Sequence, residues 1–329
     1  MNNHTIAILG AGSWGTAVAI HLARIGNRVL LWGHRQAHID ELSKLACNER
    51  YLPNIPFPPS LFLSNDLDYC LAESTIIICA VPSHAFADLL HKLDKPTAGL
   101  AWLTKGIDPN QHVLLSTLVA DKWGNDYPIA VISGPSFARE LALGMPTALT
   151  VAGNDRAYVK TIQKILHSNT LRVYHTDDAI GVQLCGAVKN VLAIACGVSD
   201  GLNYGANAKA ALITRGLAEM SRLGTSFGAR QETFMGLAGI GDLVLTCTDN
   251  QSRNRRFGIK LGQGLDPIDA EQQISQVVEG KYNAQQVCTL AAQQQIEMPI
   301  CSIITELLQN KMTASQAAEQ LMKRPARKE

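Results

Sequence analysis

A lysine and an asparagine interrupt an apolar stretch near the middle of the chain. The segment 180–201 reads IGVQLCGAVKNVLAIACGVSDG, in which Lys189 is the single basic side chain and Asn190 follows it. Its apolar residues recur at three-and-four spacing, which predicts a long helix packed on most of its circumference. A lysine in apolar surroundings has a lowered pKa and can act as a general acid or base. The alternative is a structural lysine whose stem snorkels along apolar surface to water.

One carboxylate farther along the chain is flanked by residues that favour burial. Asp242 follows the glycine-rich run GLAGIG and precedes LVLTCT. A buried carboxylate is costly unless a cation or hydrogen-bond donors pair with it. We therefore expect Asp242 to pair with Lys189.

Three arginines are concentrated in five residues of a nearly neutral protein. The segment 252–256 reads SRNRR, so Ser252 and Asn254 place a hydroxyl and an amide beside Arg253. An arginine fork with such donors suits a phosphate monoester. The alternative is a solvated basic loop.

Polar residues also follow two apolar runs in the first half of the chain. Lys105 and Gly106 come after AWLT, and the second run leads into SGPSFARE, which contains Gly134 and Ser136. Glycine lets the backbone come close to a ligand, and serine offers a hydroxyl. Because ligands bind beyond the carboxyl ends of parallel strands, we expect both segments to face a crevice. A surface position for Lys105 is the alternative.

A glycine-rich segment near the N-terminus has the pattern G-x-G-x-x-G. Gly10, Gly12 and Gly15 follow the apolar run 5–9 and precede a helical pattern, with Ser13 and Trp14 between them. The first glycine permits a tight turn, the second admits a pyrophosphate, and the third allows close packing of helix on strand. The free N–H groups of the helix N-terminus also favour phosphate. This setting predicts dinucleotide binding.

The end of the second predicted strand, 28–32, indicates which dinucleotide is used. The strand is followed by Gly33, His34 and Arg35, and no acid appears before Asp40. An NAD-specific protein usually has an acid here for the ribose hydroxyls, whereas an arginine can pair with a 2′-phosphate. We therefore expect NADPH to be accepted, and the sequence leaves open whether it is preferred over NADH. A solvated turn is the alternative.

Strand and helix patterns alternate through residue 179. Repeated β-α units with buried apolar strands predict a doubly wound, mostly parallel sheet. The proline-rich segment 51–59 interrupts the pattern and is predicted to be an extended loop. The expected strands are 5–9, 28–32, 75–80, 99–103, 129–132, 147–151 and 171–174.

From residue 180 onward the periodicity is helical and strand patterns disappear. The fold class is therefore α/β, with a dinucleotide-binding domain at 1–179 and an all-α substrate-binding and catalytic domain at 180–329. The expected helix signals are a helix 208–223 stopped by Gly224, the pair Asp266-Pro267, a cap at Asn283, a start at Pro299 and a capping box of Thr313 with Gln316.

Composition excludes several classes of function. A net charge of +1 gives no general attraction to nucleic acid or to an anionic membrane. The eight cysteines show no metal-ligand spacing, and most lie in apolar runs, so we expect reduced core thiols, no metal and a cytosolic protein. The N-terminus lacks the charged region of a signal peptide, and no membrane-spanning segment is expected.

The motifs together resemble the bacterial NAD(P)-dependent sn-glycerol-3-phosphate dehydrogenases over essentially the whole chain. The matching segments, in order, are GAGSWG, KG at Lys105, SGPSFARE, AVKN around Lys189, GLAGIGDL and SRNRRFG. The resemblance implies a cytoplasmic homodimer that uses NADPH or NADH to reduce dihydroxyacetone phosphate to sn-glycerol 3-phosphate for glycerophospholipid synthesis.

The resemblance also implies roles for individual residues. Lys189 would be the general acid/base, with Lys105 and Asp242 beside it as catalytic residues. These three would contact the substrate together with Gly134, Ser136, Asn190, Ser252, Arg253 and Asn254. The dinucleotide would be bound by Gly10, Gly12, Ser13, Trp14, Gly15, His34, Arg35, Tyr51, Lys105, Ala138, Arg253, Val277 and Glu279.

Physical chemistry supports the role of Lys189 independently. When a hydride reaches a ketone carbon, the ketone oxygen gains negative charge and must be protonated, which a desolvated ammonium can do. Lys105 would lower the pKa of Lys189 further and Asp242 would raise it. Two alternatives explain less of the sequence: a related β-hydroxy acid dehydrogenase, and a non-catalytic NADPH sensor, which would leave Lys189 without a role.

Overall fold

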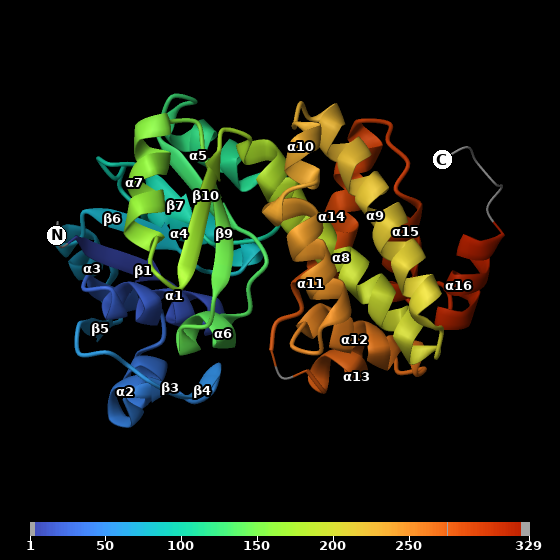
Figure 1. The fold of residues 1–329 in the computed structure, drawn as a ribbon, viewed down its shortest axis with the longest axis horizontal. Helices are drawn as coiled ribbons and strands as arrows, with labels where there is room; N and C mark the ends of the chain where they lie inside the picture. The colour runs from blue at the N-terminus through green and yellow to red at the C-terminus, as the bar shows by residue number, and fades with distance from the viewer. Residues whose placement is uncertain (1–3, 275, 324–329) are drawn as a thin grey trace. The chain divides into compact units, whose positions relative to one another are not determined.

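The chain forms two compact units (Figure 1). The computed structural model describes residues 4–274 and 276–323. The first unit contains the chain up to Thr104 together with Leu115–Ala179, and the second contains Lys105–Leu114 and the chain from Ile180 onward. The segment Lys105–Leu114 lies in the stretch that the sequence assigned to the first domain. It belongs to the second unit because Ile107 and Leu114 are buried in that unit's core.

A single eight-stranded sheet organises the first unit, and the predicted doubly wound fold is confirmed. The strand order is β10-β9-β8-β7-β6-β1-β2-β5. The strands are β1 (Thr5–Leu9), β2 (Arg28–Trp32), β5 (Leu61–Ser64), β6 (Ile76–Cys79), β7 (Leu100–Trp102), β8 (Ile129–Ser133), β9 (Thr147–Ala152) and β10 (Leu171–Thr176). Chain order reverses at β1, which lies between β2 and β6, so the crevice expected at such a switch point is at the end of β1.

Strands β9 and β10 run opposite to the rest of the sheet. β9 pairs with β8 in antiparallel fashion, whereas every other neighbouring pair is parallel. The link from β8 to β9 contains only the six-residue helix α6 (Ala138–Leu143). At 1.5 Å per residue such a helix is about 9 Å long, too short to return along a strand of about 17 Å. The chain therefore re-enters the sheet from the edge where β8 ends.

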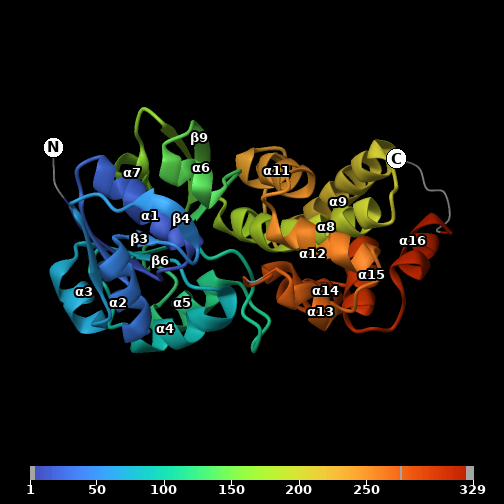
Figure 2. The same cartoon turned by 90° about the horizontal axis from the view of Figure 1, so that it is seen from below.

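Helices cover both faces of the sheet. Helices α1, α6 and α7 lie on one face, and α4 and α5 lie on the other (Figure 2). The helices of this unit are α1 (Ser13–Arg24), α2 (Gln36–Leu45), α3 (Leu67–Glu73), the 3₁₀ helix η1 (Ser83–Ala85), α4 (Phe86–Lys92), α5 (Leu115–Trp123), α6 and α7 (Arg156–Leu166).

The proline-rich segment is more ordered than the sequence predicted. Strands β3 (Cys47–Asn48) and β4 (Leu52–Pro56) form a small antiparallel hairpin apart from the main sheet. The expected extended loop thus contains β4, whose prolines are tolerated because a two-stranded hairpin has free edges.

The second unit is helical in its described residues, as predicted. Its core surrounds α8 (Ala179–Gly201), which is buried from Gly181 to Ser199. The remaining helices are α9 (Ala206–Ser226), α10 (Gln231–Phe234), the π-helix η2 (Leu237–Gly241), α11 (Asp242–Thr248), α12 (Arg253–Gly262), α13 (Pro267–Gln272), α14 (Glu279–Gln293), α15 (Pro299–Leu308) and α16 (Ala314–Met322).

Helix α8 has the length and hydropathy of a membrane span, although no such segment was expected from the sequence. However, 89% of its most apolar window is buried inside the protein. This burial is what the central helix of a helical core requires.

The helix signals were partly right. Asp266 caps α13, Pro299 begins α15, and Thr313 and Gln316 form the predicted capping box. Two predictions were wrong. Gly224 does not stop α9 but lies inside it, where a side chain would overlap the ring of Phe234, and Asn283 is buried within α14 rather than at its start.

Candidate active site

Lys189 lies in the middle of α8 and is almost completely buried, with 6% of its surface exposed. Its Nζ donates hydrogen bonds to Asp242 Oδ1 at 2.6 Å and to Thr246 Oγ1 at 2.9 Å. The predicted pairing of Lys189 with Asp242 is therefore confirmed. The snorkelling alternative is wrong, because the ammonium ends in a buried hydrogen-bonded cluster and not at the protein surface.

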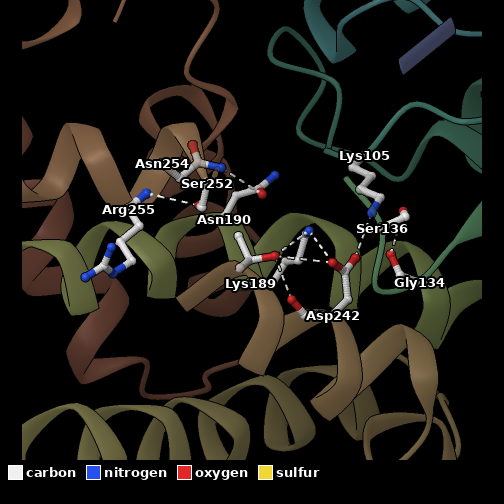
Figure 3. A network of polar contacts seen from close by, with 10 residues as sticks. Lys105, Gly134, Ser136, Lys189, Asn190, Asp242, Ser252, Asn254 and Arg255 are labelled. Carbon is white, nitrogen blue, oxygen red and sulfur yellow. Dashed lines mark hydrogen bonds and ion pairs between the residues drawn. The ribbon is translucent and has the colours of Figure 1, made fainter. Parts of the chain in front are cut away.

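Asp242 is shared between two lysines (Figure 3). Lys105 Nζ donates to Asp242 Oδ2 at 2.7 Å, so each carboxylate oxygen faces one ammonium. A kink places the carboxylate there: Gly239 leaves helical geometry (φ −88°, ψ −105°) just before α11 begins at Asp242. The site thus holds two cations and one anion, and Lys105 is the more exposed cation.

The cluster shifts the proton affinities of both buried groups. Burial lowers the pKa of Lys189 to about 8; the Asp242 carboxylate opposes this and the Lys105 ammonium adds to it. Burial would raise the pKa of Asp242, but Lys105 and Lys189 outweigh it and hold that pKa below its usual range. The cluster therefore keeps an ionised carboxylate beside a lysine that can gain or lose a proton near pH 8.

Thr246 belongs to this cluster, although no role was predicted for it from the sequence. Its hydroxyl donates to the backbone carbonyl of Asp242 at 2.6 Å, so it accepts the hydrogen bond from Lys189. The available signal was its position four residues after Asp242, which puts both side chains on one face of a helix.

A chain of amide contacts connects α8 with two other helices. Asn254 Nδ2 donates to Asn190 Oδ1 at 2.9 Å, and the Gly280 backbone N–H donates to Asn254 Oδ1 at 2.9 Å. A side chain on Gly280 would lie 2.6 Å from the Asn190 carbonyl, so α14 begins in close contact with α8. These bonds fix Glu279, the first residue of α14, relative to Arg253 at the start of α12.

The arginine cluster divides into different environments. Ser252 caps α12 by accepting from the Arg255 backbone N–H, and Arg255 itself is buried in an ion pair with Asp200. Arg256 is exposed. Burial lowers the pKa of Arg253, with the Glu279 carboxylate opposing it. Of the three arginines, Arg255 therefore has a structural partner, and the assignment of a phosphate monoester to Arg253 stays a prediction.

The glycine-rich segment has the geometry that a dinucleotide requires. Gly10 has φ +133°, and a side chain there would lie 2.7 Å from the Ala80 carbonyl, while one on Gly15 would overlap the Gly10 carbonyl. At Gly12 a side chain would meet no atom within 4 Å. The indole Nε1 of Trp14 is buried with no partner among the described residues. Open backbone and an unsatisfied donor at the start of α1 fit the phosphates of a dinucleotide.

Basic side chains gather where β2 ends. His34 and Arg35 are exposed, and Arg35 is the residue before α2. Burial lowers the pKa of His34, and the nearby charges of Arg35, Lys92 and His38 add to this. The positive field of Arg35 and Lys92 suits an anionic group such as a 2′-phosphate.

The remaining predicted residues have the following positions. Gly134 follows the last residue of β8 and has φ +139°, Ser136 Oγ donates to the Gly134 carbonyl at 3.1 Å, and Ala138 begins α6. Tyr51 lies in the turn between β3 and β4, and Val277 is exposed before α14.

The predicted residues divide between the two units. The second unit carries Lys105, Lys189, Asn190, Asp242, Ser252, Arg253, Asn254, Val277 and Glu279, and the first carries the other predicted site residues. Within the described ranges no group of three or more His, Cys, Asp or Glu side chains could hold a metal ion.

A dinucleotide-type sheet followed by a helical unit with a buried lysine–carboxylate cluster defines a nicotinamide-dependent dehydrogenase. Family profiles described as NAD-dependent glycerol-3-phosphate dehydrogenase N-terminus and C-terminus match residues 5–159 and 178–319, and the chain belongs to this family.

Relatives agree over the full length. The chain is 62% identical to glycerol-3-phosphate dehydrogenase [NAD(P)+] of Legionella pneumophila strain Paris, covering 100% of both chains. It is 52% identical to the Edwardsiella ictaluri protein of the same name, covering 99% and 97%. The crystal structure of glycerol-3-phosphate dehydrogenase from Coxiella burnetii superposes with a TM-score of 0.94 at 50% identity, covering 98% and 99%.

Proposed function

We propose that this chain catalyses the reversible reduction of dihydroxyacetone phosphate to sn-glycerol 3-phosphate with NADPH or NADH. The observation that carries the proposal is the buried Lys189 ammonium, held by Asp242 and Thr246 with a pKa of about 8. A group that exchanges a proton near this pH suits a reversible carbonyl reduction. The names of the full-length relatives support the choice of substrate.

Lys189 has the central chemical role in this proposal. The bound nicotinamide supplies a hydride to the carbonyl carbon of the substrate. As negative charge develops on the carbonyl oxygen, the Lys189 ammonium donates a hydrogen bond and then its proton, leaving a neutral amine that water reprotonates. Asp242 and Thr246 hold Nζ in one direction, and Lys105 places a second positive charge near the developing oxyanion.

The substrate phosphate is assigned to Arg253 with its neighbours Ser252 and Asn254, assisted by Asn190, Gly134 and Ser136. Fixing the phosphate of a three-carbon substrate leaves its carbonyl little freedom, and such orientation accounts for much of the rate available to an enzyme. Asn254 suits this role because its bonds to Asn190 and to the Gly280 N–H give it one orientation.

The dinucleotide is assigned to the first unit. Gly10, Gly12, Ser13, Trp14 and Gly15 would receive the pyrophosphate, and His34 and Arg35 the adenosine ribose with its 2′-phosphate. Tyr51 and Ala138 would add contacts from this unit, and Lys105, Arg253, Val277 and Glu279 from the second. Residues 1–179 accordingly form the dinucleotide-binding domain and 180–329 the substrate-binding domain, to which Lys105 is added.

The cellular setting is also part of the proposal. A cytoplasmic homodimer that supplies glycerophospholipid synthesis is consistent with the resemblance of the motifs and with eight cysteines that form no disulfide in this structure.

The direct test is an assay with dihydroxyacetone phosphate and NADPH, followed by loss of nicotinamide absorbance and by chiral analysis of the product. We expect turnover to sn-glycerol 3-phosphate. Lys189→Ala should lower kcat by about 100-fold or more, the usual contribution of a general acid, while NADPH still binds. A folded wild-type protein that binds NADPH without consuming it would refute the enzyme in favour of a sensor, and preference for a keto acid would refute the substrate.

A further inference from the structure

Asn48 is a completely buried polar residue to which the proposed reaction assigns no role. It ends β3, in the proline-rich hairpin beside the main sheet, and 0% of its surface is exposed. A buried amide is costly unless its donors and acceptor are satisfied. Its partners therefore indicate what the hairpin holds in place.

The Asn48 amide connects the hairpin with the glycine-rich segment. Nδ2 donates to the Ala11 carbonyl at 3.1 Å and to Thr16 Oγ1 at 2.8 Å, and Oδ1 accepts from the Tyr51 N–H at 3.3 Å. The orientation of the amide is fixed, because a carbonyl only accepts and a backbone N–H only donates. Asn48 thus holds both the loop before α1 and the first turns of that helix.

A second side chain converges on the same carbonyl. His38 Nε2, from α2, lies 3.3 Å from the Ala11 oxygen and must carry the proton there, because the carbonyl cannot donate. Two donors from outside the glycine-rich segment therefore direct one of its peptide groups.

The orientation of the Ala11 carbonyl also sets the orientation of the Gly12 N–H. The Ala11–Gly12 peptide is trans and planar, so the Gly12 N–H points opposite to the Ala11 C=O and away from Asn48 and His38. The backbone at Gly12 is open, since a side chain there would meet no atom within 4 Å. Two donors on the carbonyl also polarise the peptide and make its N–H a stronger donor.

We propose that Asn48 is a positioning residue for the dinucleotide: it orients the Ala11–Gly12 peptide so that the Gly12 N–H faces the pyrophosphate. The proposal rests on the proposed use of NADPH. The hairpin is then a support for the nucleotide loop as well as the carrier of Tyr51.

The test compares NADPH use by the wild type, Asn48→Ala and Asn48→Asp. Asn48→Ala should raise the KM and the dissociation constant for NADPH about tenfold, the effect of one lost hydrogen bond to a charged group, with kcat within about twofold. Asn48→Asp should raise both further, because a carboxylate cannot donate to Ala11 and repels the phosphates. If Asn48→Ala fails to fold, Thr16→Val, which removes one Asn48 partner, should raise the dissociation constant about threefold.

A matched control distinguishes a change in the orientation of the Ala11–Gly12 peptide from a general loss of stability. Asn27 is also buried in the first unit and donates from Nδ2 to the Leu22 carbonyl at 3.2 Å, near the other end of α1. Asn27→Ala should lower Tm without changing the dissociation constant for NADPH. Adenosine 2′-monophosphate, which lacks the pyrophosphate, should inhibit the wild type and Asn48→Ala equally.

Two results would overturn the proposal: an unchanged dissociation constant for NADPH in the folded variants, or equal weakening of NADPH and adenosine 2′-monophosphate. Binding is followed by nicotinamide fluorescence and needs no turnover. The role of Asn48 can therefore be judged even if dihydroxyacetone phosphate is not the substrate, and a wild type that binds no NADPH would refute the proposed cofactor use itself.

Discussion

Burial disfavours the charged form of Lys189, and the Asp242 carboxylate limits how far the pKa of Lys189 falls. Burial has the largest influence on its pKa, Asp242 the next and Lys105 a smaller one in the direction of burial. The thiol of Cys247 adds no charge, because hydrogen bonding to Cys196 and burial raise its pKa well above the usual range. The balance sets the pH at which the proton is exchanged.

The rate in each direction should depend on pH through the protonation state of Lys189. Reduction requires the protonated Lys189, so kcat for dihydroxyacetone phosphate should fall as the pH rises through about 8. Oxidation of glycerol 3-phosphate requires the neutral amine, so its kcat should rise over the same range. Because the Asp242 carboxylate raises the pKa of Lys189, Asp242→Asn should move both inflections to lower pH.

Steady-state kcat profiles in both directions measure these inflections. Asp249→Asn, at the end of the same helix, is the control and should leave the profiles unchanged. An inflection that stays in place or moves to higher pH in Asp242→Asn would exclude Lys189 as the titrating group.

The sequence was a better guide to the buried charged residues than to the polar residues that form hydrogen bonds with them. The pair of Lys189 and Asp242 could be inferred because each is a charge in an apolar run and needs a partner. Thr246 and Asn48 are ordinary polar residues whose roles exist only through contacts distant in sequence. Arg253 and Arg255 could not be distinguished, because two residues apart on a helix point about 200° apart and the sequence does not show which side is buried.

At the scale of elements, close packing of two helices positions the proposed phosphate site. Helices α8 and α12 cross where Gly197 and Gly201 face Gly258 and Gly262. A side chain on Gly258 would overlap the Ile194 carbonyl, and one on Gly197 would overlap the Arg255 carbonyl. The two backbones therefore touch, as small residues at four-residue spacing allow. This contact fixes the start of α12, with Arg253, relative to Lys189.

Gly258→Ala adds a methyl group at the contact between α8 and α12. The added methyl should push α12 away from α8, costing about 1–3 kcal/mol of stability as an overpacked contact. The KM for dihydroxyacetone phosphate should rise about tenfold, because displacement of a binding group by about 1 Å has large effects on positioning. Thermal melting and steady-state kinetics measure the two effects.

Gly205→Ala is the matched control, since a side chain there meets no atom within 4 Å and the backbone has φ −73°. Its KM for dihydroxyacetone phosphate should equal that of the wild type. A normal KM in Gly258→Ala would mean that the α8–α12 contact does not set the phosphate site.

The elements themselves were predictable where periodicity was long. The seven expected strands and α8 follow from apolar runs. Strands β3, β4 and β5 have only two to five residues, and β4 contains two prolines, so no pattern distinguished these strands from a loop. The direction of β9 depends on the length of α6, which is a property of the connection and not of the strand. The predictions for Gly224 and Asn283 were wrong because glycine and asparagine occur at helix ends and also at close-packed positions inside helices.

At the scale of the whole molecule, each unit has a hydrophobic core of its own. The chain passes between the units after Thr104, after Leu114 and after Ala179, so the second unit is assembled from two separate segments. Lys105 comes from the shorter segment, and its contact with Asp242 depends on the second core through Ile107 and Leu114. A domain boundary drawn once along the chain therefore separates Lys105 from its partners.

Because each unit has its own core, we expect NADPH to protect the two units from opening to different extents. All eight cysteines are free thiols, and Cys79 in the first unit and Cys301 in the second are fully buried. Their reaction with a thiol reagent requires opening of the surrounding core. At 100 times its dissociation constant, NADPH should slow labelling of Cys79 about 100-fold, because only the folded dinucleotide unit binds it. Labelling of Cys301 should slow less, because fewer NADPH contacts are proposed from the second unit, namely those of Arg253, Val277 and Glu279.

Mass spectrometry of timed samples measures both rates, with phosphate of equal ionic strength replacing NADPH in the control. Equal slowing of both cysteines would show that the two cores open together, and the units would then be one cooperative structure despite their separate cores.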